Sequence, residues 1–469
     1  MGLTLFEKLW RQHEISRLND TKSLLYIDRI FLHERTGSFA LTSLERNERS
    51  VRRREHTFCT MDHIVDTFPG RGDDTLMPSG REFIIATRSA ANFAGIKLFD
   101  IQDPSQGIVH VISPELGIAL PGATLICPDS HTCTLGGIGA LAWGVGSTEA
   151  EHALATSTLR VDKPATMRVN FVGKKPIGVT AKDIALYAIR TLSSSGGSGF
   201  AIEFAGEAIR KLTVEERLTL CNMATELSAF TALIAPDEQV FSYFNDKPYA
   251  PQKAHRLLAL EHWMSLASDS DAHFDREEHI DISGLKPQIS WGISPEHCID
   301  FDALIPNPRN APDPYVAAAW QRALDYMELK PGGKLSDYEI DAAFLGSCTN
   351  SRLSDLQLAA DYLDLTGATV SDKVKALCVP GSGSVKRAAE DLGLHKIFLR
   401  AGFEWREPGC SMCFFAGGET LGDRVRVAST TNRNFEGRQG PGVKTHLASP
   451  LSVVASACAG RLVAAEQRL

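Results

Sequence analysis

The chain has few cysteines for its size, ten in 469 residues. A secreted disulfide-bonded scaffold, which concentrates cysteine in a short chain, is therefore excluded. The sequence also lacks an apolar run of the ~18 residues that a membrane helix needs. No basic stretch followed by an apolar core opens the chain, so we expect no secretory signal. These absences predict a cytoplasmic protein with no membrane partner.

Positive charge is also in short supply. Lys and Arg number 49 against 57 Asp and Glu, which gives a formal net charge of −8. Nucleic-acid binding needs a basic surface to neutralise phosphates, so we expect no nucleic-acid partner. Hydrophobic residues make up 43% of the chain and charged residues 23%, as in ordinary globular proteins. The length suits about three domains.

Two segments suggest where the domains divide. Residues 193–199 are rich in Ser and Gly, and residues 306–314 hold four prolines. We therefore predict domains over residues 1–195, 196–310 and 311–469. In the last of these, strand-like runs at 340–345 and 376–379 are each followed by a turn and a helical pattern, at 354–363 and 385–392. This alternation predicts a doubly wound α/β fold with ligands on the loops that follow the strands.

Cysteine spacing gives the strongest chemical signal. Cys410-Ser411-Met412-Cys413 is a C-x-x-C motif, and Cys348 follows a predicted strand far upstream. Alone, the motif suits half of a zinc site, a redox pair or no function at all. A zinc ribbon needs a second C-x-x-C motif, which this sequence lacks. Three thiolates from two loops instead fit an iron–sulfur cluster with one iron free of protein ligands, and such an iron acts as a Lewis acid.

Acid and histidine residues form a second group of candidates. Asp62-His63 and Asp129-Ser130-His131 each place a carboxylate near an imidazole in a turn-like setting, and His110 lies between them in sequence. A single histidine of this kind is more often structural than catalytic. Several such elements in one part of the chain favour acid–base chemistry, which needs clustered titratable groups.

Two arginines, Arg433 and Arg438, lie in one polar, glycine-bearing loop. Arginine keeps its charge and binds carboxylates through two parallel hydrogen bonds, so the pair suits a dicarboxylate or tricarboxylate. A surface loop with ion pairs is the alternative interpretation.

Together these motifs resemble the signatures of the aconitase superfamily. The resemblance rests on Gly346-Ser347-Cys348-Thr349-Asn350-Ser351-Arg352, on residues 406–413 and on residues 432–438. Residues 403–406 and 437–440 are most similar to its branch of bacterial isopropylmalate dehydratase large subunits. Further similarity at residues 26–29, 129–132, 201–206 and 221–223 extends the resemblance over nearly the whole chain.

The resemblance implies a three-domain core of doubly wound α/β domains around a central iron–sulfur site. It implies a [4Fe–4S] cluster on Cys348, Cys410 and Cys413. The residues that match active-site positions are Asp62, His63, His110, Asp129, His131 and Glu203, and those that match substrate-binding positions are Ser130, Asn432, Arg433 and Arg438.

The implied activity is that of a hydro-lyase that interconverts 2-isopropylmalate and 3-isopropylmalate by dehydration and rehydration, in leucine biosynthesis. The substrate is then a small hydroxy-dicarboxylic acid. In this superfamily a serine of a further, swivelling domain takes the proton from the substrate. The chain ends at Leu469 without room for that domain, so we expect a separate small subunit that supplies it.

Some positions depart from the family pattern. Phe39, Ile64 and Phe230 are apolar where polar residues are usual, and Cys133 and Leu135 also differ. A paralogous dehydratase of a citramalate-like, dimethylmalate-like or homoaconitate-like substrate therefore stays open. From another class, a non-catalytic iron–sulfur or RNA-binding regulator is disfavoured by the acidic charge and by the presence of the Asp-His pairs. A plain zinc protein is the remaining alternative.

Overall fold

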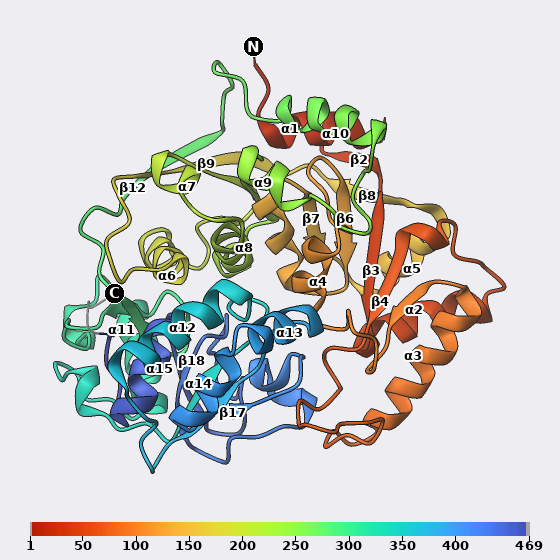
Figure 1. Cartoon of the computed structure of the whole chain (residues 1–469). Coiled ribbons are helices and arrows are strands. Elements are labelled where there is room, and N and C mark those ends of the chain that lie inside the picture. The colour runs from red at the N-terminus through yellow and green to blue at the C-terminus, as the bar shows by residue number, and fades with distance from the viewer. Residues whose placement is uncertain (1, 466–469) are drawn as a thin grey trace.

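One winding pattern recurs in the parallel β-sheets of residues 2–465, the part of the chain that the computed structural model describes. In each of three sheets the first strand lies inside, the next two are added on one side, and the chain then crosses to the other side of the first strand. Figure 1 shows the resulting parts: the first in red and orange, the second in yellow and green, and the third in cyan and blue, below the second and beside helices α2 and α3 of the first. This is the doubly wound arrangement that the alternation of strands and helices predicts.

The first sheet and its helices span residues 29–156. They comprise β3 (Arg29–His33), α2 (Glu34–Arg46), β4 (Thr57–Thr60), α3 (Gly80–Ala94), β5 (Lys97–Phe99), α4 (Val109–Glu115), β6 (Thr124–Cys127), β7 (Leu141–Gly144) and α5 (Ser147–Thr156). The strand order is β5-β4-β3-β6-β7. The winding therefore reverses between β3 and β6, and the carboxyl ends of two such strands form the crevice where open α/β sheets bind ligands.

A small antiparallel sheet and an amphipathic helix precede and flank this part. They are α1 (Leu5–His13), β1 (Glu14–Arg17), β2 (Lys22–Tyr26) and β8 (Thr158–Asp162), with β2 in the middle of the sheet. A capping box between Thr4 and Glu7 begins α1, which buries Leu5, Leu9 and Trp10 on one face.

The second sheet has the order β11-β10-β9-β12. Its part of the chain contains β9 (Ala165–Val172), α6 (Ala181–Leu192), β10 (Phe200–Ala205), α7 (Glu207–Arg210), α8 (Val214–Asn222), β11 (Thr231–Leu233), α9 (Glu238–Tyr243), α10 (Ala254–Met264) and β12 (Arg276–Asp281). β9 and α6 lie on the N-terminal side of the 195/196 boundary predicted above, so this sheet begins earlier in the chain than that boundary. The domain boundaries stay a prediction.

The third sheet has the order β17-β16-β15-β18-β19, with a reversal between β15 and β18. Its elements are β15 (Ala342–Leu345), α12 (Leu353–Thr366), β16 (Lys375–Cys378), α13 (Gly383–Asp391), α14 (Leu394–Ala401), β17 (Glu404–Trp405), β18 (Arg426–Ser429), β19 (Lys444–Leu447) and α15 (Pro450–Ala459). The two strand–turn–helix units predicted for this region are confirmed.

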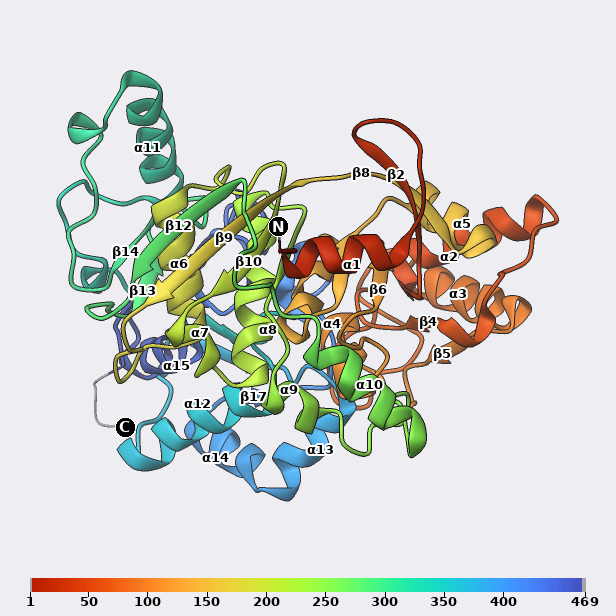
Figure 2. The ribbon, with the colours of Figure 1, turned by 90° about the horizontal axis from the view of Figure 1, so that it is seen from above.

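Outside the three parallel sheets, β13 (Gln288–Ser290) pairs with β14 (Cys298–Asp300), and α11 (Pro314–Met327) stands at an outer corner of the molecule (Figure 2). The short 3-10 helices are η1 (Arg54–His56), η2 (Ser130–Ile138), η3 (Met223–Leu227), η4 (Pro308–Asn310), η5 (Leu335–Asp337), η6 (Ser411–Cys413) and η7 (Phe415–Gly417). Within residues 2–465, no helix is long and apolar enough to cross a membrane.

Backbone contacts join the first and third parts directly. A β-bridge links Gly107 to Ser382, and the amide of Ile108 donates to the carbonyl oxygen of Gly381 at 2.9 Å. Ile108 and Val111 are also buried in the hydrophobic cluster that contains β15 and α12. The loop before α4 in the first part and the loop after β16 in the third part are therefore held against one another.

Candidate active site

The turn after β4 is fixed by a buried carboxylate. Glu34, the first residue of α2, accepts the backbone N–H groups of Asp62 at 3.0 Å and His63 at 2.6 Å, and that of Ile64 as well. The carboxyl group is fully buried, and this burial, with the charge of Asp62 nearby, raises the pKa of Glu34 to about 7. Glu34 thus anchors the segment that presents Asp62 and His63.

His63 lies between two carboxylates. Its Nδ1 is 2.6 Å from Asp62 Oδ1, and its Nε2 is 3.3 Å from Asp129 Oδ2. Burial alone would lower the pKa of His63, but the charge of Asp62 and hydrogen bonds to both carboxylates raise it well above its ordinary value. The site therefore favours the protonated imidazole, which stacks on the ring of His33 with the centroids 4.1 Å apart.

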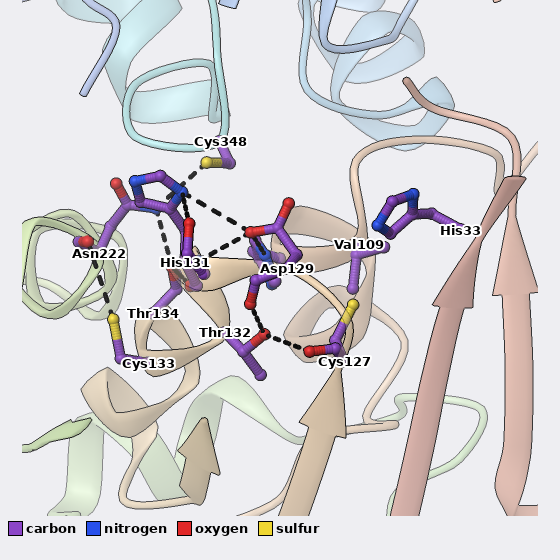
Figure 3. Close-up of polar contacts among 12 residues, drawn as sticks. His33, Val109, Cys127, Asp129, His131, Thr132, Cys133, Thr134, Asn222 and Cys348 are labelled. Carbon is purple, nitrogen blue, oxygen red and sulfur yellow. Dashed lines mark hydrogen bonds and ion pairs between the residues drawn. The ribbon is translucent and has the colours of Figure 1, made fainter. Parts of the chain in front are cut away.

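Asp129 is the centre of the histidine group (Figure 3). Its Oδ1 lies 3.0 Å from His110 Nε2 and accepts the backbone N–H of His131 at 2.7 Å. Burial would raise the pKa of Asp129, but His110 and the other histidines around it hold that pKa well below its usual range. The predicted residues Asp62, His63, His110, Asp129 and His131 are thus brought together around an ionised carboxylate.

A carboxylate from the second part of the chain, which contains the second sheet, also contacts this group. Glu226, in η3, has its Oε1 3.1 Å from His131 Nε2 and accepts a hydrogen bond from Arg433 Nε at 2.7 Å. Arg433 also donates from Nη1 to the hydroxyl of Ser130 at 3.0 Å. The predicted substrate residues Ser130 and Arg433 are therefore in contact with each other beside His131.

The three predicted cysteines line the facing side of the site. Cys348 follows β15, Cys410 precedes η6 and Cys413 is the last residue of η6; all three are buried. The side-chain amides of Asn222 and Asn432 donate to Cys348 Sγ at 3.2 and 3.4 Å. In Figure 3, Cys348 points toward Asn222 and His131 across the centre of the site.

The donor set of these cysteines fits a metal cluster. All three are free thiols. Burial and the neighbouring Cys413 raise the pKa of Cys348 to about 12, and burial raises that of Cys410 well above its ordinary value. Thiolates in this interior therefore need a cation, which a metal centre provides. N–H groups directed at sulfur are the hydrogen bonds expected around such a centre.

Arginines surround Phe414, the residue after Cys413. The guanidinium carbons of Arg35 and Arg438 lie 4.5 and 5.4 Å from the ring centroid. Arg438 Nη2 lies 3.7 Å from Cys413 Sγ. Arg438 Nε and Arg35 Nη1 are buried nitrogens without a hydrogen-bond partner among the described residues. Charged donors without a partner beside the cysteines can bind an anion through hydrogen bonds.

Glu203, the remaining predicted catalytic residue, lies apart from the others. It accepts a hydrogen bond from Ser268 Oγ at 2.6 Å in a separate cavity of about 370 Å³ that Arg168 and Asp269 also line. Ser268 Oγ in turn accepts the backbone N–H of Leu5. Through Ser268, Glu203 is thus linked to the first residue of α1.

Of the positions that depart from the family pattern, Phe39 and Phe230 contact residues outside this group, whereas Ile64 belongs to the turn that presents Asp62 and His63. Phe39 is 60% exposed and contacts Phe83 edge-on at 5.9 Å, while Phe230 packs on Trp143 at 5.5 Å. Ile64 is fully buried. The contacts of Phe39 and Phe230 are thus with aromatic residues of the surrounding fold, and none is recorded with the described cysteines or histidines of the site.

Three contributors were missed from the sequence: Glu34, Arg35 and Glu226. Glu34 and Arg35 directly follow β3, at the reversal of the first sheet, and that position was the available signal. Glu226 lies just beyond the Cys221-Asn222-Met223 motif, which the resemblance already covered.

The geometry is thus that of a buried acid–base group facing three thiols and two arginines, and the chain belongs to the aconitase family (aconitate hydratase), which it matches over residues 7–460. The match confirms the predicted family and fold class. The chain is 50% identical over 461 residues to 3-isopropylmalate dehydratase large subunit 1 of Bradyrhizobium diazoefficiens, covering 98% of this chain and 96% of that relative. Among solved structures it matches holo-form aconitase X of Thermococcus kodakaraensis, with a TM-score of 0.48 and 13% identity over 88% of this chain and 84% of the other.

Proposed function

We propose that this chain is the cluster-bearing large subunit of a 3-isopropylmalate dehydratase, a cytoplasmic hydro-lyase of leucine biosynthesis that interconverts 2- and 3-isopropylmalate. The observation that carries the proposal is the buried set of Cys348, Cys410 and Cys413 facing the Asp129 histidine group. The 50% identity to a protein of that name over nearly the whole chain supports the substrate.

Cys348, Cys410 and Cys413 would hold a [4Fe–4S] cluster. When bound, the cluster supplies a Lewis-acidic iron that polarises the substrate hydroxyl. The amides of Asn222 and Asn432 support Cys348 from the protein side. Their N–H groups stabilise negative charge on sulfur.

The remaining groups divide into anion-binding and proton-handling residues. Arg438, with Arg35 beside it, and Arg433, near Ser130, bind the two carboxylates of the substrate. A bidentate arginine both neutralises the charge of a carboxylate and fixes its orientation. His63, held by Asp62 and Asp129, delivers a proton to the departing hydroxyl. His110, Asp129 and His131 orient the water that leaves and returns.

A small subunit with a swivelling domain completes the enzyme in this proposal. The chain's relative is itself named a large subunit, which supports a partner. The residue that removes the proton next to a substrate carboxylate would come from that subunit. The full cleft then forms only in the complex, where water is excluded and the substrate is aligned.

The test is to purify the chain anaerobically, reconstitute it with iron and sulfide, and assay it with and without its small subunit. We expect turnover of 2- and 3-isopropylmalate that depends on the small subunit and saturates with its concentration. Full turnover by the lone chain would refute the two-subunit part. Activity of the complex on citramalate, dimethylmalate or homoaconitate but not on isopropylmalate would instead support the paralogous dehydratase.

A further inference from the structure

A lysine is buried against the loop that follows β18, and no described carboxylate pairs with it. Lys182, on α6, has no exposed surface. Its ammonium donates to the carbonyl oxygens of Thr430, at 3.1 Å, and Thr431, and its Nζ lies 3.7 Å from Met223 Sδ. Within residues 2–465 no ion pair joins Lys182 to an acidic side chain. A buried, unpaired charge is costly, so its retention calls for an anion nearby.

The carbonyls that Lys182 contacts belong to the loop after β18, which lies against the loop of Cys348. Gly346 lies two residues before Cys348. The hydroxyl of Thr430 accepts the backbone N–H of Gly346 at 2.9 Å and donates to its carbonyl oxygen at 2.8 Å. Thr431 precedes Asn432, whose amide donates to Cys348 Sγ. Lys182 thus binds the loop after β18 directly, and Thr430 links that loop to the loop of Cys348.

The electrostatic environment agrees with this geometry. Burial lowers the pKa of Lys182 to about 8, and the groups that oppose this lowering are Cys348, Glu226, Cys413 and Asp355. Glu226 is already engaged by His131 and Arg433, and Asp355 by Asn350 and the backbone of Arg352. The cysteines are therefore the anions left to complement the ammonium once they are thiolates.

We propose that Lys182 is the fixed positive charge that offsets the thiolates of Cys348 and Cys413, and that it thereby sets the reduction potential of the bound cluster and its retention of iron. This inference rests on the cluster assignment proposed above. Lys182 is a positioning residue, since it acts through the cysteines and touches no substrate. Reduction adds negative charge to the cluster, so a nearby ammonium favours the reduced form.

The experiment compares Lys182→Met, Lys182→Gln and Lys182→Arg in the reconstituted chain. Spectroelectrochemistry measures the potential, and iron release to a chelator measures retention. At a given applied potential, both neutral variants should show at least a tenfold lower ratio of reduced to oxidised cluster. For one electron this corresponds to a reduction potential lower by about 59 mV. They should also lose iron at least tenfold faster, whereas Lys182→Arg stays close to the wild type.

Lys444→Met is the matched control. Lys444 is a nearly buried lysine of β19 that pairs with Glu328 at 2.6 Å, and its loss should move neither quantity. A wild-type potential in Lys182→Met, or Lys182→Arg behaving like Lys182→Met, would overturn the inference. So would neutral variants that fail to fold even without iron, by circular dichroism, because the lysine would then be a structural clamp. A wild-type chain that takes up no cluster would instead refute the proposed function itself.

Discussion

Glu226 Oε1 lies 3.1 Å from His131 Nε2, so that an acidic residue of the second part of the chain orients a histidine of the first. Burial would raise the pKa of Glu226, but its hydrogen bond to His131 and the nearby charge of Arg433 lower it, which keeps the carboxylate ionised. The same oxygen accepts from Arg433 at 2.7 Å. One carboxylate therefore holds both His131 and Arg433, the side chains proposed to orient the reacting water and to bind the substrate anion.

Replacing Glu226 with Gln should reduce kcat/KM about a hundredfold while the iron content stays that of the wild type. The amide loses the charge that holds His131 and Arg433, and hydrogen bonds to charged groups contribute about 1.5–3 kcal/mol each. Steady-state kinetics of the complex with the small subunit and iron analysis measure the two quantities.

Glu203→Gln is the matched control for that variant. Glu203 is buried to a similar degree, but its partner is Ser268. We expect its kcat/KM to stay near the wild-type value and its thermal stability to fall. A larger loss of kcat/KM in Glu203→Gln than in Glu226→Gln would return Glu203 to the catalytic group.

Serine at position 348, 410 or 413 should abolish the cluster. Each substitution removes one of three thiolates, and iron–sulfur clusters depend on these ligands. Iron and sulfide content and the broad visible absorption of the reconstituted chain should all fall. Cys221→Ala, at another buried cysteine, should leave them unchanged. Equal loss in that control would mean that the spectrum reports folding and not ligation.

Much of this architecture follows from local sequence signals. The third part was predictable because strand, turn and helix alternate there with regular spacing, and because Cys348 directly follows a strand. The carboxyl ends of parallel strands share one edge of a sheet, which explains why motifs far apart in sequence, at Cys348 and Asn432, meet in space.

Other features depend on how the three parts meet, which no local pattern encodes. Glu203, on β10, contacts Ser268 in the segment that follows α10. Glu226 lies in a short 3-10 helix, which has no periodic signature in the sequence. In the sequence, Lys182 looks like an ordinary polar residue of a helix, and nothing local indicates that it is buried. Its burial arises only when α6 packs against the loops of the third sheet.

Stability should depend on pH through His13 and Asp28, whose Nε2 and Oδ2 are 2.8 Å apart. Burial opposes ionisation of both, yet their hydrogen bond and mutual attraction raise the pKa of His13 and lower that of Asp28. The pair therefore contributes fully between the unfolded pKa values, about 4 for Asp and 6.5 for His. Its contribution is lost as pH rises through the raised pKa of His13, and as pH falls through the lowered pKa of Asp28.

His13→Gln should accordingly destabilise the apo chain by about 2 kcal/mol near pH 5.5 and by less near pH 8.5. Thermal unfolding midpoints of both proteins at both pH values measure this difference. His255→Gln, at a histidine of α10 for which no ion pair is recorded among the described residues, serves as the control and should show no such dependence. An equal loss of stability for His13→Gln at the two pH values would mean that packing, and not charge, links α1 to the turn between β2 and β3.

Arg438 has a buried Nε that finds no hydrogen-bond partner among the described residues, and its guanidinium lies over Phe414. Lysine keeps the charge but not the planar fork that binds a carboxylate through two parallel hydrogen bonds. Arg438→Lys should therefore retain the cluster and lower kcat/KM by roughly a hundredfold, since a charge-assisted contact to substrate contributes a few kcal/mol. Arg322→Lys provides the control, because Arg322 pairs with Glu436 on the exposed side of the same loop at 2.9 Å. It should leave the kinetics unchanged. Wild-type kinetics in Arg438→Lys, measured with the small subunit present, would remove this arginine from the substrate site.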